Sequence, residues 1–171
     1  MDIHYHDKNY RDSVAKMIRI VVENDIFVSE LCDNLVNTVF YIDYNGKYFP
    51  NNQWTDFANS VLGMWAHTLL RSKDSADIRF KLYFMDGPFR MDVAKNNKMQ
   101  LTIDCVNSRK TEVAEFAFEC SYYEFLCAMN DALKEFNLIL YNNGMHKGRF
   151  EPIYEQAIIT MQEIQNAIGK Y

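Results

Sequence analysis

Histidine side chains near the N-terminus have the chemistry for metal binding. His4 and His6 are flanked by Asp2 and Asp7, and alternate side chains of an extended segment lie on one face. Imidazole and carboxylate groups are common ligands of transition metals. Chain termini are usually poorly ordered unless other elements hold them, so we expect no native metal site here.

Two further histidines and the cysteines are candidate general bases and nucleophiles. His146 lies beside Lys147 in a glycine-flanked loop, and imidazole titrates near neutral pH. No Ser, Cys or Asp stands next to it to complete a dyad, and His67 is predicted to be a solvated or core-edge residue of a helix. The cysteines are Cys32, Cys105, Cys120 and Cys127. They form no Cys-x-x-Cys pair, which predicts reduced, largely buried thiols.

The sequence contains none of the common catalytic motifs. There is no glycine-rich phosphate loop, no Gly-x-Ser-x-Gly, no His-Glu-x-x-His and no calcium loop. Catalytic carboxylate pairs need unequal environments, whereas alternation places Glu115 and Glu119 together on a polar strand face. We therefore expect a binding protein with no catalytic residue, no cofactor and no metal. The alternative is a small enzyme or ligand-binding domain with a pocket between sheet and helices.

Acidic residues are concentrated in two stretches that contain no Lys or Arg. Residues 20–46 hold five acids, which together equal the formal net charge of −5 of the whole chain. Residues 112–133 repeat the pattern. The acids are Glu23, Asp25, Glu30, Asp33 and Asp43 in the first stretch, and Glu112, Glu115, Glu119, Glu124 and Asp131 in the second. Such a surface repels nucleic acid, whose binders need Lys and Arg, and attracts a basic partner.

The first acidic stretch also carries tyrosines, which are frequent anchors of protein interfaces because they join an apolar ring to a polar tip. We therefore predict a partner-binding surface on its strands and loops. This surface comprises Glu23, Asp25, Glu30, Asp33, Tyr41, Asp43 and Tyr44. The expected partner is a basic protein, and neither nucleic acid nor a membrane is expected to bind.

Length and composition are typical of one globular domain over residues 1–171. Apolar residues make up 49% of the chain and charged residues 24%, which is ordinary for a domain with its own core. The N-terminus lacks the apolar segment of a secretory signal, and no apolar run approaches the roughly 18 residues of a membrane span. We expect a cytoplasmic location.

Strands are predicted from apolar residues that recur at every second position. Four such segments lie between about 78 and 120, separated by short polar turns, which predicts a four-stranded antiparallel meander. One or two N-terminal strands are expected at 18–22 and 38–44. The second of these ends at Asn45-Gly46, a favourable tight-turn pair.

Three helices are predicted from apolar stripes with a spacing of three and four residues. The first covers roughly 53–71 and follows a pair of potentially capping asparagines. The second, about 122–141, opens on a capping box that starts at Ser121. The third covers 152–168 and has Pro152 in its first turn. Helices and meander together predict an α+β fold, in which the helices cover an antiparallel sheet.

The helix anchors and the hairpin turn carry a family resemblance. The residues concerned are Trp54-Thr55-Asp56-Phe57, Val61-Leu62, Trp65, Phe84-Met85-Asp86-Gly87-Pro88-Phe89 and Ile103-Asp104-Cys105. Over about residues 36–120 this pattern resembles small bacterial immunity proteins of polymorphic toxin and contact-dependent growth inhibition systems. The resemblance implies a cytosolic protein that binds and neutralises a cognate toxin domain and has no catalytic residues. Many such toxins are nucleases, which are basic because they hold phosphates.

Overall fold

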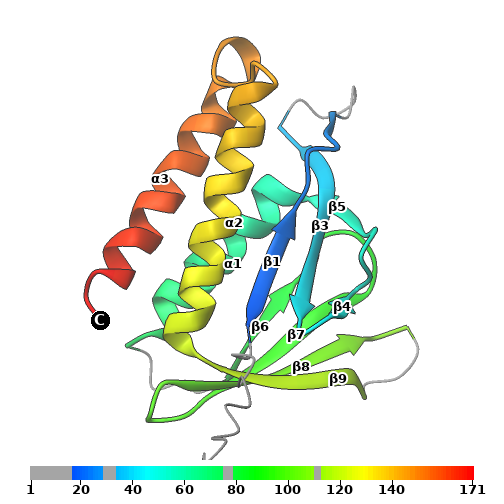
Figure 1. The fold of residues 1–171 in the computed structure, drawn as a ribbon, viewed down its shortest axis with the longest axis vertical. Coiled ribbons are helices and arrows are strands. Elements are labelled where there is room, and N and C mark those ends of the chain that lie inside the picture. Colours follow the sequence, from blue (N-terminus) through cyan, green and yellow to red (C-terminus); the bar gives the residue numbers. More distant parts are fainter. Residues whose placement is uncertain (1–16, 29–33, 75–78, 110–112) are drawn as a thin grey trace, which may run out of the picture.

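The computed structural model describes residues 17–28, 34–74, 79–109 and 113–171 (Figure 1). Within them, two antiparallel sheets and three α-helices confirm the α+β class. The first sheet holds β1 (Ile18–Val22), β2 (Phe27–Val28), β3 (Val36–Tyr44), β4 (Lys47–Phe49) and β5 (Thr55–Phe57). The second holds β6 (Arg79–Tyr83), β7 (Phe89–Lys95), β8 (Gln100–Asn107) and β9 (Ala114–Ser121). The helices are α1 (Ala58–Ser72), α2 (Tyr122–Asn142) and α3 (Glu151–Ile168), with a short 3-10 turn, η1, at Gly148–Phe150.

The second sheet is the meander that the alternation predicts. Its strand order is β6-β7-β8-β9, and each neighbouring pair is antiparallel. Leu82, Met91, Ile103 and Phe118 are buried, whereas the residues that flank them in sequence are partly or fully exposed. One face of this sheet therefore belongs to the core, and the other faces water.

The first sheet is larger than the one or two N-terminal strands expected. Its strands pair around β3, which has β1 on one side and both β4 and β5 on the other. The β3–β4 hairpin turns at Asn45 and Gly46, whose φ angles of 53° and 79° are those of a type I′ turn. Strands as short as β4 and β5 contain too few alternating residues to give a periodic signal.

Helix α1 starts at Ala58, later than the predicted helix 53–71, and no side chain caps it. The residues just before Ala58 form β5, because they pair with β3 in an antiparallel ladder. Trp54 is therefore not part of the helical stripe. It packs edge-on against Phe89 instead, with ring centroids 4.7 Å apart.

Two buried side chains hold the turn between β6 and β7, and we call this region the hairpin junction. The Asp56 carboxylate accepts hydrogen bonds from the N–H of the next residue at 2.7 Å, and from those of Met85 and Asp86 at 3.0 and 3.1 Å. The Trp65 indole N–H donates to the Tyr83 carbonyl oxygen at 2.7 Å. Because Asp56 is fully buried and Trp65 almost so, these bonds join β5 and α1 to the second sheet.

Helices α2 and α3 lie close to their predicted bounds. The capping box is present, because Ser121 and Glu124 exchange hydrogen bonds at the start of α2. After α2, Gly144 has a φ of 72° and the Met145 N–H donates to the Leu140 carbonyl oxygen, which is the Schellman arrangement. In Figure 1, α2 lies between α3 and β1. This placement brings one face of α2 against the first sheet.

Candidate partner-binding site

The two histidines that the structure describes lie at the surface or against an aromatic ring. His67 is exposed on α1. His146 stacks on Tyr141, and its Nδ1 lies 3.2 Å from the carbonyl oxygen of that residue. His4 and His6 lie outside the described residues. Within the described residues, no three His, Cys, Asp or Glu side chains are grouped so that they could hold a metal ion.

The described cysteines are free thiols, and two of them are buried as predicted. Burial raises the pKa of Cys120 to about 12, with a smaller contribution from the negative charge of Glu124. Burial also raises the pKa of Cys105, so both thiols stay protonated at neutral pH and are poor nucleophiles. Cys127 is only partly buried, and Cys32 lies outside the described residues.

Three residues of the predicted interface, Glu23, Tyr41 and Asp43, lie on the face of the β1–β3 pair that points away from the core. Tyr41 is itself buried there, with 8% of its area exposed. With two neighbours, the three residues form what we call the strand face, which comprises Arg19, Glu23, Tyr41, Asp43 and Tyr48. The Tyr41 hydroxyl donates to Glu23 Oε1 at 3.3 Å, and Arg19 Nη1 lies 3.8 Å from Asp43 Oδ2. The rings of Tyr41 and Tyr48 meet edge-on at 5.7 Å. Burial and then the charge of Glu23 raise the pKa of Tyr41, so its hydroxyl remains a donor.

The other predicted interface residues do not join the strand face. Tyr44 stacks on Phe118 with ring centroids 4.4 Å apart, and its hydroxyl donates to the Glu119 carbonyl oxygen at 3.3 Å. Asp25 is exposed in the bend after β1, where its N–H donates to the Glu23 carbonyl oxygen at 2.8 Å. Two members of the predicted set, Glu30 and Asp33, lie outside the described residues. Tyr44 is thus a packing residue, because successive side chains of a strand point to opposite faces.

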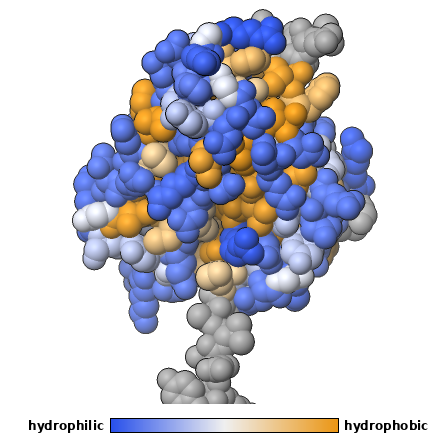
Figure 2. All heavy atoms as spheres, turned by 45° about the horizontal axis from the view of Figure 1, so that its top comes forward, coloured by the Kyte–Doolittle hydropathy of each residue, from blue (hydrophilic) through white to orange (hydrophobic). Residues whose placement is uncertain are grey.

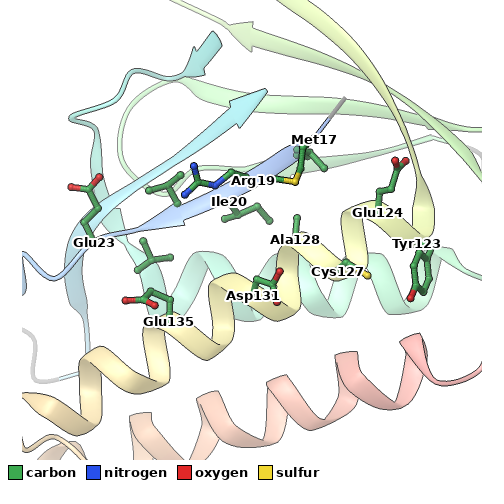
Figure 3. A pocket seen from close by; sticks show the side chains of 13 residues that line it. Met17, Arg19, Ile20, Glu23, Tyr123, Glu124, Cys127, Ala128, Asp131 and Glu135 are labelled. Carbon is green, nitrogen blue, oxygen red and sulfur yellow. The ribbon is translucent and has the colours of Figure 1, made fainter. Parts of the chain in front are cut away.

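A groove of about 730 Å³ runs along β1 and one face of α2, and we call it the β1–α2 groove (Figure 3). Its first wall is the strand, since every residue from 17 to 23 lines it. The second wall is formed by Tyr123, Glu124, Cys127, Ala128, Asp131 and Glu135. In Figure 3, Glu23 and Glu135 stand at one end and Tyr123 and Glu124 at the other. Figure 2, in which the top of the Figure 1 view is turned forward, shows apolar residues through the middle of the visible face, flanked by hydrophilic ones.

The groove carries an excess of negative charge. Its charged lining residues are Glu23, Glu124, Asp131, Glu135 and Arg19. All four of these carboxylate side chains are exposed. The single base among the described lining residues, Arg19, already pairs with Asp43 on the strand face. Three of the acids have near partners. Glu23 Oε1 accepts from the Tyr41 hydroxyl at 3.3 Å, Glu124 Oε2 accepts from the Ser121 N–H at 2.5 Å, and Asp131 Oδ1 lies 3.6 Å from Lys134 Nζ. The groove is therefore an apolar channel with acidic rims.

The groove unites the two acidic stretches of the sequence. Glu23 comes from the first stretch, whereas Glu124 and Asp131 come from the second, about a hundred residues later in the chain. The sequence alone did not predict that Glu23 lines the same groove as Glu124 and Asp131. The available signal was the helical spacing of Glu124, Asp131 and Glu135, which places their side chains near one another along α2. Glu115 and Glu119, in contrast, are exposed on β9, as the alternation predicts.

Two smaller hollows have different linings. A hollow of about 150 Å³ lies among the three helices and contains no charged residue. A shallow hollow of about 480 Å³ lies over β6, β7 and β8, where Arg79 and Lys81 balance Asp92 and Asp104. The β1–α2 groove differs from both in its excess of negative charge, with four acids and one base in its lining.

Comparison with protein-family models, with curated proteins and with solved structures finds no match for this chain. In the part of the chain that the structure describes, no helix has the length and apolar character needed to cross a membrane. The geometry and charge of the site are therefore the guide to function.

Proposed function

We propose that this chain is an immunity-type inhibitor, which neutralises a basic toxin domain by stoichiometric binding. The observation that carries the proposal is the β1–α2 groove, where four exposed carboxylates surround an apolar channel. Acidic rims raise the encounter rate with a basic protein, and the channel offers apolar area to be buried on contact. The resemblance to immunity proteins supplies the specific partner class, and a nuclease domain has the required basic charge.

The strand face extends the proposed contact surface beyond the groove. Arg19 and Glu23 belong to both, because β1 presents one edge to the groove and one face to solvent. Tyr48 and Tyr123 are 43% and 44% exposed, so each ring has area left to bury against a partner. Exposed tyrosines beside acids are the residue types that anchor tight interfaces, because the ring buries apolar area while the hydroxyl keeps a hydrogen bond.

We further propose that inhibition needs no catalysis by this chain. The buried thiols are held protonated, and His146 is engaged with Tyr141. A nucleophile and a base within reach of one another would be required for covalent chemistry. The described histidines and cysteines supply no such pair in the contacts above.

The size of the groove favours one other candidate, a domain that binds or converts a small molecule. Small-molecule sites usually have volumes of about 300–1,000 Å³, and the groove lies within this range. Its charge restricts the ligand to a cation, such as a polyamine. Thermal unfolding of the full chain with and without spermidine separates the candidates, because an increase of the midpoint at micromolar ligand is expected only for the small-molecule site.

The proposed function predicts that the gene immediately upstream encodes a large secreted protein whose variable C-terminal domain is the toxin, and this domain is the one to test. We expect co-production of the full chain to restore growth of cells that make this domain, and the purified domain to be inhibited at a one-to-one molar ratio. Absence of both rescue and binding would refute the inhibitor function.

A matched pair of variants locates the surface. The groove variant carries Glu23→Lys, Asp131→Lys and Glu135→Lys. The control carries Glu151→Lys, Glu155→Lys and Glu163→Lys, which are exposed residues of α3 and change the net charge equally. We expect the groove variant to lose rescue and the control to retain it. Equal loss in both variants would mean that net charge, and not the groove, controls binding.

A further inference from the structure

The hydrogen bonds of β1 determine which of its backbone groups reach β3 and which reach the open edge. The strand is antiparallel to β3, and the Glu23 N–H donates to the carbonyl oxygen of Val39, directly opposite, at 3.1 Å. In an antiparallel ladder, such hydrogen-bonded pairs alternate with pairs whose N–H and C=O groups point away from the partner strand. Every second residue counted back from Glu23 therefore bonds β3. The residues whose backbone groups point the other way are Ile18, Ile20 and Val22.

This second edge of β1 opens into the β1–α2 groove. Among the described residues, β1 pairs with β3 alone. All seven consecutive residues from 17 to 23 line the groove. Because successive side chains of a strand point to opposite faces, an unbroken run of lining residues means that the backbone edge itself borders the groove. Unpaired strand edges are templates for another strand.

We propose that the partner places an extended basic segment in the β1–α2 groove, where it pairs with the open edge of β1 as an added strand. This inference rests on the partner-binding function proposed above and names the part of the partner that the groove receives. Strand addition provides affinity through main-chain hydrogen bonds, and the flanking side chains provide specificity.

The dimensions of the two walls agree with a short strand. The five residues of β1 extend about 17 Å at roughly 3.3 Å per residue. From Glu124 to Glu135, α2 rises by about 17 Å at 1.5 Å per residue. The groove therefore accommodates about five residues of an extended segment along its whole length.

The lining predicts the composition of the inserted segment. Side chains of the added strand that point toward α2 meet Cys127 and Ala128, which are small and leave space for apolar groups. Side chains at the rims meet Glu23, Asp131 and Glu135, which favour Lys or Arg. The segment is thus expected to alternate apolar and basic residues.

Amide hydrogen exchange of the full chain, followed by nuclear magnetic resonance, tests the pairing. The probe is a blocked seven-residue peptide of alternating lysine and valine. We expect saturation with the peptide to slow exchange of the Ile20 and Val22 amides at least about tenfold. The Val21 amide, which already bonds β3, is expected to change less than about twofold. The control is the same peptide N-methylated at each internal residue, which keeps charge and side chains but removes the backbone donors, and we expect it to bind at least about tenfold more weakly.

The outcomes separate this inference from the inhibitor function. Strand addition is overturned by any of three results: equal affinity for both peptides, no binding of either peptide, or binding without protection of the Ile20 and Val22 amides. The inhibitor function is decided separately, by whether the full chain rescues growth. Strand addition is also overturned if the Ile20 and Val22 amides are already protected from exchange in the free protein. If that protection increases with protein concentration, a second copy of the chain occupies the edge.

Discussion

The hairpin junction and the β1–α2 groove both combine carboxylates with aromatic rings, but they place them in opposite environments. Asp56 is fully buried and accepts three backbone hydrogen bonds, so its carboxylate stabilises the fold and is not accessible to a partner. The carboxylates of Asp131 and Glu135 are exposed at the rim of an apolar channel, where their negative charge attracts an approaching basic molecule. Burial, and not residue type, therefore distinguishes a structural acid from one available for binding.

The largest effect on the free energy of unfolding is expected in the hairpin junction. Replacement of Trp65 by Ala is expected to lower the free energy of unfolding by about 3–5 kcal/mol, because it leaves a cavity and an unpaired Tyr83 carbonyl oxygen. In the β1–α2 groove, Tyr123 is 44% exposed, and its replacement by Ala is expected to change the free energy of unfolding by less than about 1 kcal/mol. Denaturant unfolding followed by circular dichroism measures both. Equal midpoints for Trp65→Ala and wild type would contradict the packing of α1 on the sheets.

A smaller loss is expected when Asp56 is replaced by Asn. The amide keeps one acceptor oxygen, but its NH₂ group faces a backbone N–H, so about 1–3 kcal/mol of stability is expected to be lost. The matched change in the groove, Asp131→Asn, is expected to cost less than about 0.5 kcal/mol. Comparison of the two unfolding free energies at neutral pH provides the measurement. Similar values for both variants would remove the distinction between the two regions.

The pH dependence of stability sharpens the contrast further. Burial raises the pKa of Asp56 above its ordinary value of 3.8, although the hydrogen bonds from backbone N–H groups oppose this shift. The native state then binds the proton more tightly than the unfolded chain, so the contribution of this group is full below pH 3.8 and is lost as pH rises through the native pKa. The stability advantage of wild type over Asp56→Asn is therefore expected to decrease between about pH 3 and about pH 7. If the stability advantage of wild type instead increases with pH, the backbone N–H donors lower the pKa of Asp56 by more than burial raises it.

The smallest effect on stability is expected in the groove. The triple change of Glu23, Asp131 and Glu135 to Lys is expected to alter the unfolding free energy by less than about 1 kcal/mol, since exposed charges contribute little. Association with the lysine-valine peptide is expected to weaken at least about tenfold, and wild-type binding to weaken as salt rises, because exposed charges are screened beyond about 8–10 Å. Titration at two salt concentrations measures both. Unchanged, salt-independent binding would show that the rims do not attract the peptide.

Much of the fold was predictable because periodicity follows from local geometry. The meander and α2 were predicted from residues whose spacing alone determines which side is buried, as Leu82 and Phe125 illustrate. The start of α1 was predicted too early because the segment around Asp56 has a helical pattern in sequence but pairs with β3 in space. Tertiary pairing overrides such local preferences, since a ladder satisfies backbone groups that a first helical turn leaves open.

The sequence by itself determined the α+β class, the capping of α2 and the presence of two base-free acidic stretches, because these depend on residues close together in the chain. Only the tertiary structure decided that Glu23 lies across a groove from Asp131, that Tyr44 packs inward and that one edge of β1 is unpaired among the described residues. These features depend on which strand pairs with β3 and which helix packs beside it. Such long-range contacts are set by the burial of the whole core and leave no periodic trace in the local sequence.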